Sequence, residues 1–160
     1  MSENNSLQIA LEPLFQKLPL THAMPSLSGS HPVHTSLIEE LLQFPLLQQR
    51  PELAAGLWLY ADNLERCHDL CQNLPDSTGA WWHGIMHRRE PDYPNAHYWM
   101  RRAERAVAPE LLRLNPHQLI DQVSLAAPAD TQGLLALQRQ EWAVLFEYYV
   151  RGAGSSISIV

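Results

Sequence analysis

The sequence of 160 residues lacks the features of several large protein classes. Acidic residues outnumber lysine and arginine by 17 to 11, and the net charge is −6 with histidine neutral. Nucleic-acid binding needs a broad basic surface, which this composition does not offer. No run reaches the roughly 18 apolar residues of a membrane span. The opening residues, MSENNSLQIA, do not follow the basic-then-apolar order of a secretion signal.

Cysteine is also scarce, since Cys67 and Cys71 are the only two. Two thiols cannot build the disulfide framework of a small secreted domain. Both lie on the apolar stripe of a predicted helix, so we expect buried reduced thiols and not metal ligands. Together these features predict a cytoplasmic protein with neither a nucleic-acid nor a membrane partner. The sequence carries no signal for the oligomeric state.

Signatures of several enzyme classes are missing as well. We find no serine with a nearby histidine and aspartate signature, no glycine loop of the type that cradles phosphate and no dinucleotide fingerprint. No cofactor is therefore expected. The period-2 alternation typical of strands is missing too, which favours a helical fold.

Apolar residues make up 46% of the chain, enough for one core in a single helical domain over 1–160. They recur at helical spacing. An amphipathic helix is predicted over 7–18, followed by a strap over 19–35 that is rich in proline and serine, so that 1–35 forms a helix plus a strap. The tail over 152–160 is expected to fray.

About six helices are expected, packed as antiparallel hairpins in an all-α fold. Ser36 and Glu39 have capping-box spacing and should start a short helix that ends near Pro45. Pro51 should open a long helix to about residue 74. The other helices are predicted over 79–90, over 94–107, from Asn115 and Pro116 to Val123, and from Asp130 to about residue 151. The last of these helices is expected to face the core with Leu135, Trp142, Leu145 and Tyr149.

The segment WWHGIMHRREPDYPNAHYWMRR, residues 81–102, holds three tryptophans, three histidines and four arginines. It lies within a predicted αα-hairpin at about 79–107, because the short PDYP break makes the two helices antiparallel neighbours. In the first helix, His83, His87 and Glu90 share one stripe. In the second helix, one predicted flank consists of His97, Arg101 and Glu104, and the other of Tyr98, Arg102 and Arg105. Two aromatic residues, Trp81 of the first helix and Tyr98 of the second, are predicted to lie off the apolar faces.

Glycine inside a helix costs about 1 kcal/mol relative to alanine, so Gly84 indicates a close contact between helices. We expect the small residues Ala96 and Ala103 of the second helix opposite it. With Met100, these positions resemble a single tetratricopeptide-type unit, and Pro109 stands one residue late for that pattern. The resemblance implies a helical hairpin of the kind that stacks in arrays.

A second resemblance covers about a fifth of the chain. The stretch is similar to a group of microbial helical proteins of unassigned activity that share the pattern W-H-x-x-x-H-R-R-E-x-D-Y-x-N-x-x-Y-W followed by arginine. This resemblance implies a functional site shared with that group but does not indicate which reaction or ligand the site serves. The matching residues are Trp82, His83, His87, Arg88, Arg89, Glu90, Asp92, Tyr93, Asn95, Tyr98, Trp99, Arg101 and Arg102.

A metal site is one interpretation of the histidines. His83 and His87 have the i,i+4 spacing of zinc peptidases, but the glutamate of their H-E-x-x-H motif is missing. Glu90 could be a third ligand, and the pair Glu65 and His68 could face it from the preceding helix. The alternative is a pair of interfacial histidines hydrogen-bonded to neighbours. The sequence favours this alternative, so no metal is expected.

The arginines also allow two interpretations. Five of ten lie between residues 80 and 106 with only three acids, a local charge of +2 that leaves −8 for the rest of the chain. They could bind an anion, since guanidinium offers paired donors. They could also pair with an acidic stripe formed by Asp62, Glu65 and Asp69. We expect a mixture, with Arg88 or Arg105 as a brace and Arg101 as a site residue.

These patterns lead to two functional hypotheses. The first is a binding protein that holds a protein partner or a small anionic ligand at a surface within residues 83–105. The second is a small enzyme that uses His83, His87 and Glu90, with or without a metal ion. The candidate ligand-binding residues of the first hypothesis are His83, His87, Glu90, His97, Tyr98, Arg101 and Arg102.

Overall fold

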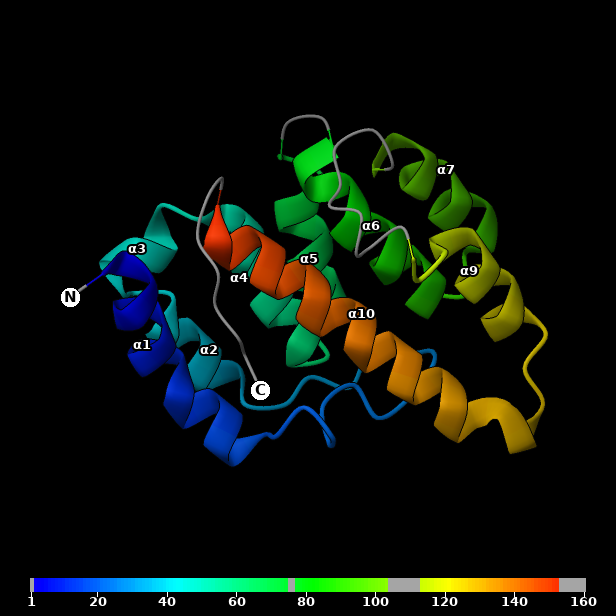
Figure 1. Cartoon of the computed structure of the whole chain (residues 1–160), viewed down its shortest axis with the longest axis horizontal. Helices are drawn as coiled ribbons and strands as arrows, with labels where there is room; N and C mark the ends of the chain where they lie inside the picture. The colour runs from blue at the N-terminus through cyan, green and yellow to red at the C-terminus, as the bar shows by residue number, and fades with distance from the viewer. Residues whose placement is uncertain (1, 75–76, 104–112, 153–160) are drawn as a thin grey trace.

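A computed structural model describes residues 2–74, 77–103 and 113–152, and these residues form helices, turns and loops without a strand (Figure 1). The predicted all-α fold is confirmed. The helices are α1 (Glu3–Lys17), α2 (Thr35–Leu41), α3 (Pro45–Gln48), α4 (Pro51–Tyr60), α5 (Leu64–Cys71), α6 (Ser77–Arg89), α7 (Tyr93–Ala103), α9 (Pro116–Ser124), the 3-10 turn η1 (Pro128–Asp130) and α10 (Thr131–Arg151).

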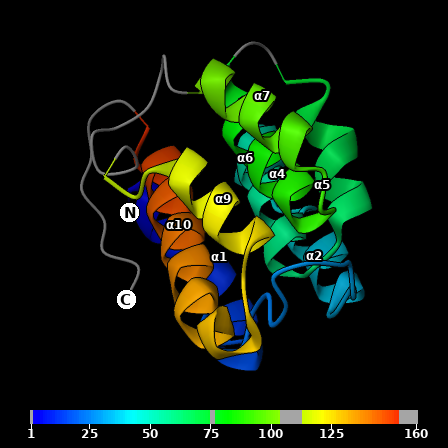
Figure 2. The same ribbon diagram turned by 90° about the vertical axis from the view of Figure 1, so that its right-hand side faces the viewer.

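The core forms where α10 crosses the other helices. Trp142 of α10 stacks on Phe146 and lies 4.5 Å from the ring of Tyr60 on α4, measured between ring centroids. Its indole nitrogen donates to the carbonyl of Gly56 at 2.8 Å. Trp82 of α6 lies 6.3 Å from Trp142, so one buried aromatic cluster joins α4, α6 and α10. Figure 2 shows α9 lying between α7 and α10, and α9 contacts both.

Residues 18–34, where the sequence predicted a strap over 19–35, contain no regular helix and run along the lower edge of the molecule in Figure 1, and Thr35 already belongs to α2. The strap is held by hydrogen bonds from later parts of the chain. Gln138 Nε2 donates to the Ser26 carbonyl at 3.1 Å, and Arg139 Nε donates to the Ala23 carbonyl at 2.8 Å. The Gly29 amide donates to the carbonyl of Arg89 at 2.8 Å. The strap therefore connects α1 to both α6 and α10.

The single long helix predicted from residue 51 to 74 is wrong. The chain turns between α4 and α5 because Asp62 adopts a left-handed conformation, with φ of 62°. Asn63 then caps α5, with its side chain accepting a hydrogen bond from the Arg66 amide at 3.1 Å. The turn changes the phase of the helix. Asp62, predicted on an exposed stripe, is consequently fully buried, whereas Glu65 and Asp69 are exposed.

The predicted start of α2 is also wrong by two residues. The helix begins at Thr35 after His34, and no side chain makes a capping hydrogen bond there, so Ser36 is not a cap. Pro45, predicted to lie where this helix ends, also begins the next one. It occupies the first turn of the short helix α3, a position that tolerates proline because no backbone donor is needed there.

The predicted αα-hairpin is confirmed for α6 and α7, and residues 104–107 lie outside the described residues. A Cβ atom added to Gly84 would lie 2.8 Å from Cε of Met100 and 2.9 Å from its Sδ, which confirms the close helix contact. The expected partners Ala96 and Ala103 are buried, but the residue against Gly84 is Met100, whose unbranched side chain fits beside the glycine.

The last two helices largely follow the prediction. Asn115 caps α9 and Pro116 occupies its first turn. In α10, Leu135, Trp142 and Leu145 are buried as expected, and Tyr149 is only partly buried. Among the described residues, no helix combines the length and the apolarity that crossing a membrane would require.

Candidate metal site

Two of the predicted site residues meet a third histidine. His83 and His87 lie one turn apart on α6, and His68 of α5 reaches them from the side. Their ligating atoms all lie within 4.8 Å of one another. The ring centroids are 4.9 Å apart for His68 and His83, 5.7 Å for His68 and His87, and 4.9 Å for His83 and His87. We call these residues the three-histidine cluster.

The environment of the cluster favours neutral imidazoles. His83 and His87 are 3% and 9% exposed, and the Nδ1 atom of each is buried without a hydrogen-bond partner among the described residues. Burial, followed by the neighbouring His87 and His68, lowers the pKa of His83 to about 4. Burial also lowers the pKa of His87, against the opposite effect of Glu90 and Asp92. Neutral imidazole is the form that binds metal ions.

Two carboxylates border the cluster. Glu90 Oε2 and Asp92 Oδ2 lie 3.5 Å and 3.8 Å from Nδ1 of His87. The structure thus brings Glu90 close to His87, as the shared stripe implies, but the third member of the cluster is His68. The Glu65-x-x-His68 spacing was the sequence signal for His68. Helical spacing could not place Asp92 there, although it belongs to the microbial pattern, because it lies near His87 only through the turn after α6.

The helix α7 forms the other border of the cluster. Trp99 stacks on His83 with the ring centroids 3.9 Å apart and the planes 12° from parallel. The Cζ atom of Arg102 lies 5.6 Å from the Trp99 ring and 5.7 Å from the Tyr98 ring, and Arg102 donates to the Tyr98 hydroxyl at 3.4 Å. Arg101 and Arg102 are exposed and form no ion pair with any described residue.

His97 belongs to a different group of residues. Its Nε2 atom lies 2.9 Å from Asp121 Oδ1, and its Nδ1 atom lies 2.8 Å from Nδ1 of His117. These contacts connect α7 to α9. The structure therefore separates His97 from the three-histidine cluster, although the sequence grouped it with Arg101. Two members of the predicted flanks, Glu104 and Arg105, lie outside the described residues.

Two arginines of the stretch act inside the fold. Arg88 is fully buried and donates to Glu141 of α10 at 2.9 and 3.2 Å. Arg89 is fully buried and pairs with Asp62. Internal pairing thus accounts for these two arginines, and Asp62 is the member of the predicted acidic stripe that takes part. Burial raises the pKa of Glu141 even though Arg88 opposes it.

Trp81, predicted to lie off the apolar face, is 1% exposed and belongs to the core. The prediction was wrong because α6 is covered on nearly all sides by α4, α5 and α7. Tyr98 is 44% exposed, as expected for its position.

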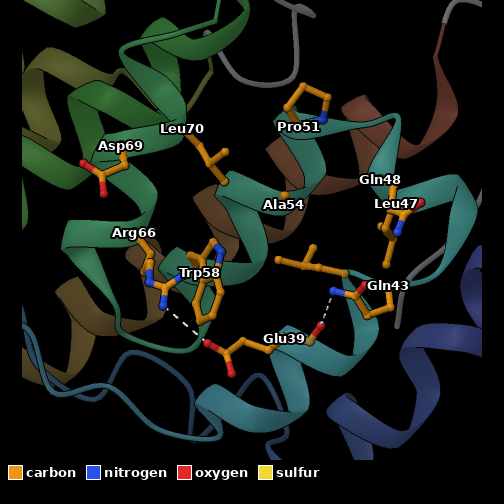
Figure 3. A pocket seen from close by; sticks show the side chains of 11 residues that line it. Glu39, Gln43, Leu47, Gln48, Pro51, Ala54, Trp58, Arg66, Asp69 and Leu70 are labelled. Atoms are coloured by element: carbon orange, nitrogen blue, oxygen red, sulfur yellow. Dashed lines mark hydrogen bonds and ion pairs between the residues drawn. The ribbon is translucent and has the colours of Figure 1, made fainter.

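A hollow of about 650 Å³ lies elsewhere, between α2, α3, α4 and α5 (Figure 3). Arg66 lies over the Trp58 ring at 5.1 Å and pairs with Glu39 at 3.3 Å across its rim. Leu42, Ala54 and Leu70 contribute apolar lining. None of the site residues predicted from the sequence lines this hollow.

No family model, no curated protein and no solved structure matches the chain.

Proposed function

We propose that the protein binds one divalent transition-metal ion of the zinc class through the imidazoles of His68, His83 and His87. The observation that carries the proposal is their convergence, with all ligating atoms within 4.8 Å. The buried Nδ1 atom of His83, which has no partner among the described residues, supports it, because a buried polar atom normally finds one. Imidazole suits zinc, copper, nickel and iron, whereas magnesium and calcium prefer oxygen ligands.

Binding requires a small rearrangement of the cluster. A tetrahedral zinc ion with Zn–N bonds of about 2.1 Å holds its nitrogens roughly 3.4 Å apart. The rings of His83 and His87 are stacked within 11° of parallel, so their in-plane lone pairs cannot point at one ion. One ring must therefore turn about its Cβ–Cγ bond. Because His83 also stacks on Trp99, turning His83 would change the surroundings of that indole.

Glu90 and Asp92 have a role in this arrangement. Metal-bound histidines usually donate their second ring N–H to a carboxylate, which fixes the ring and its tautomer. Both carboxylates lie near Nδ1 of His87. They are therefore placed to accept from Nδ1 when the ion is bound through Nε2. Three protein ligands leave one position of a tetrahedral ion open, which is the pattern of catalytic and not of structural zinc sites.

Calorimetric titration of metal-free protein with Zn²⁺ tests the proposal. We expect one ion per chain, with binding weakened at least tenfold in His68→Ala and in His83→Ala. His97→Ala is the matched control, because it removes an imidazole from the contact between α7 and α9, and its affinity should equal that of wild type. Absence of binding at micromolar protein, or equal affinity in all three variants, would overturn the proposal. Circular dichroism establishes that each variant is folded.

A further inference from the structure

The three-histidine cluster carries no charge of its own in the form that binds metal. A divalent ion held by three neutral imidazoles keeps its full double charge, and its open position then favours an anionic ligand. Glu90 and Asp92 approach His87 and not the other two rings, so they place negative charge on one side of the ion only. An anion is therefore favoured on the side of the ion away from these carboxylates.

Arg102 belongs to the helix α7, whose Trp99 stacks on His83. Its guanidinium and the imidazole of His83 both contact the Trp99 ring, so they are neighbours across a single side chain. Arg102 forms no ion pair with any described residue, and its contact with Tyr98 is to a neutral hydroxyl. A guanidinium held by two aromatic rings keeps its charge and its paired donors for a ligand.

We infer that the open position of the ion takes a small oxyanion, a carboxylate or a phosphate, whose outer oxygens accept hydrogen bonds from Arg102. This inference rests on the proposed metal binding. Carboxylate and phosphate share the necessary chemistry, since one oxygen binds the ion while a second meets the guanidinium.

Arg101 provides a matched control for Arg102. Both arginines are exposed on α7, carry the same charge and lack an ion pair with the described residues. Only Arg102 lies over the Trp99 and Tyr98 rings. Replacing either arginine removes the same net charge from the same helix. A difference between the two variants therefore reports position and not overall charge.

The experiment uses protein loaded with Co²⁺, whose visible absorption responds to the atoms bound directly to the ion. Titration with inorganic phosphate, and separately with acetate, should change this spectrum in a saturable way. The stronger response identifies the preferred oxyanion. Arg102→Ala should weaken the tighter ligand by about tenfold or more, Arg102→Lys by less, and Arg101→Ala by no more than about twofold. Metal-free protein should bind neither anion.

The outcomes separate the two proposals. If Co²⁺ does not bind at the cluster, the proposed function fails and the inference fails with it. If Co²⁺ binds and neither anion changes its spectrum, metal binding stands and the oxyanion inference is overturned. Equal anion affinity in Arg102→Ala and wild type would also overturn it, because the anion would then bind the ion without Arg102.

Discussion

The absence of a side chain at Gly84 allows α6 and α7 to pack closely against each other. Leucine at this position would overlap the end of Met100 and is expected to destabilise the protein by about 1–3 kcal/mol. Alanine should cost less, because the methionine end can move aside. Gly133→Leu on α10 is the matched control, since a Cβ atom there meets nothing within 4 Å. Urea unfolding measures the difference, and equal stability of the two leucine variants would contradict the contact.

Individual residues were predictable where helical geometry alone decides their neighbours. His83 and His87 share a stripe because they are four residues apart on one helix. The burial of Trp81, of Asp62 and of Glu141 was not predictable, because it depends on which other helices cover each position. The same limit applies to His68, which local spacing could suggest but could not place beside His83.

Asp62 determines where one helix ends and the next begins. It holds a left-handed backbone between α4 and α5, and it pairs with the buried Arg89. Asp62→Asn keeps a residue that tolerates this backbone and removes only the charge. Arg89 would then be buried without a counter-charge, so we expect a loss of about 3–5 kcal/mol in the free energy of unfolding.

Asp69→Asn is the control for this substitution, because Asp69 is exposed on α5 and its variant should lie within about 0.5 kcal/mol of wild type. Chemical denaturation of both variants gives the comparison. Similar stability would mean that Arg89 does not depend on Asp62.

Element boundaries were harder to predict than element type. The apolar pattern of residues 51–74 is continuous and favours one helix. The break at Asp62 depends on a tertiary ion pair and on the strap that covers it, with Ser30 Oγ donating to the Asp62 carbonyl at 3.0 Å. Asn115 and Pro116 mark a helix start correctly, because a cap and a first-turn proline act locally.

At the scale of the whole molecule, Arg88 and Glu141 join α6 to α10 across the core. Removing one partner leaves the other charge buried, so Arg88→Met or Glu141→Leu alone should cost about 3–5 kcal/mol. The double variant should be more stable than either single variant, because two apolar side chains replace a desolvated pair. A double-mutant cycle by urea unfolding measures this coupling.

The exposed pair of Arg66 and Glu39 serves as a reference for that cycle. Both side chains are about half exposed, and their coupling energy should stay below about 1 kcal/mol. Additive effects at Arg88 and Glu141, with no coupling beyond that of the reference pair, would show that the buried charges act independently.

The strap has a consequence for how the protein is made. The carbonyls of Ala23 and Ser26 receive hydrogen bonds from Arg139 and Gln138, which follow more than a hundred residues later. At synthesis rates of roughly 5–20 residues per second, the strap leaves the ribosome several seconds before its donors exist. Until then these backbone carbonyls are hydrogen-bonded to water. In a nascent chain arrested before α10, the strap that follows α1 would therefore lack these hydrogen bonds. A protease could then reach it.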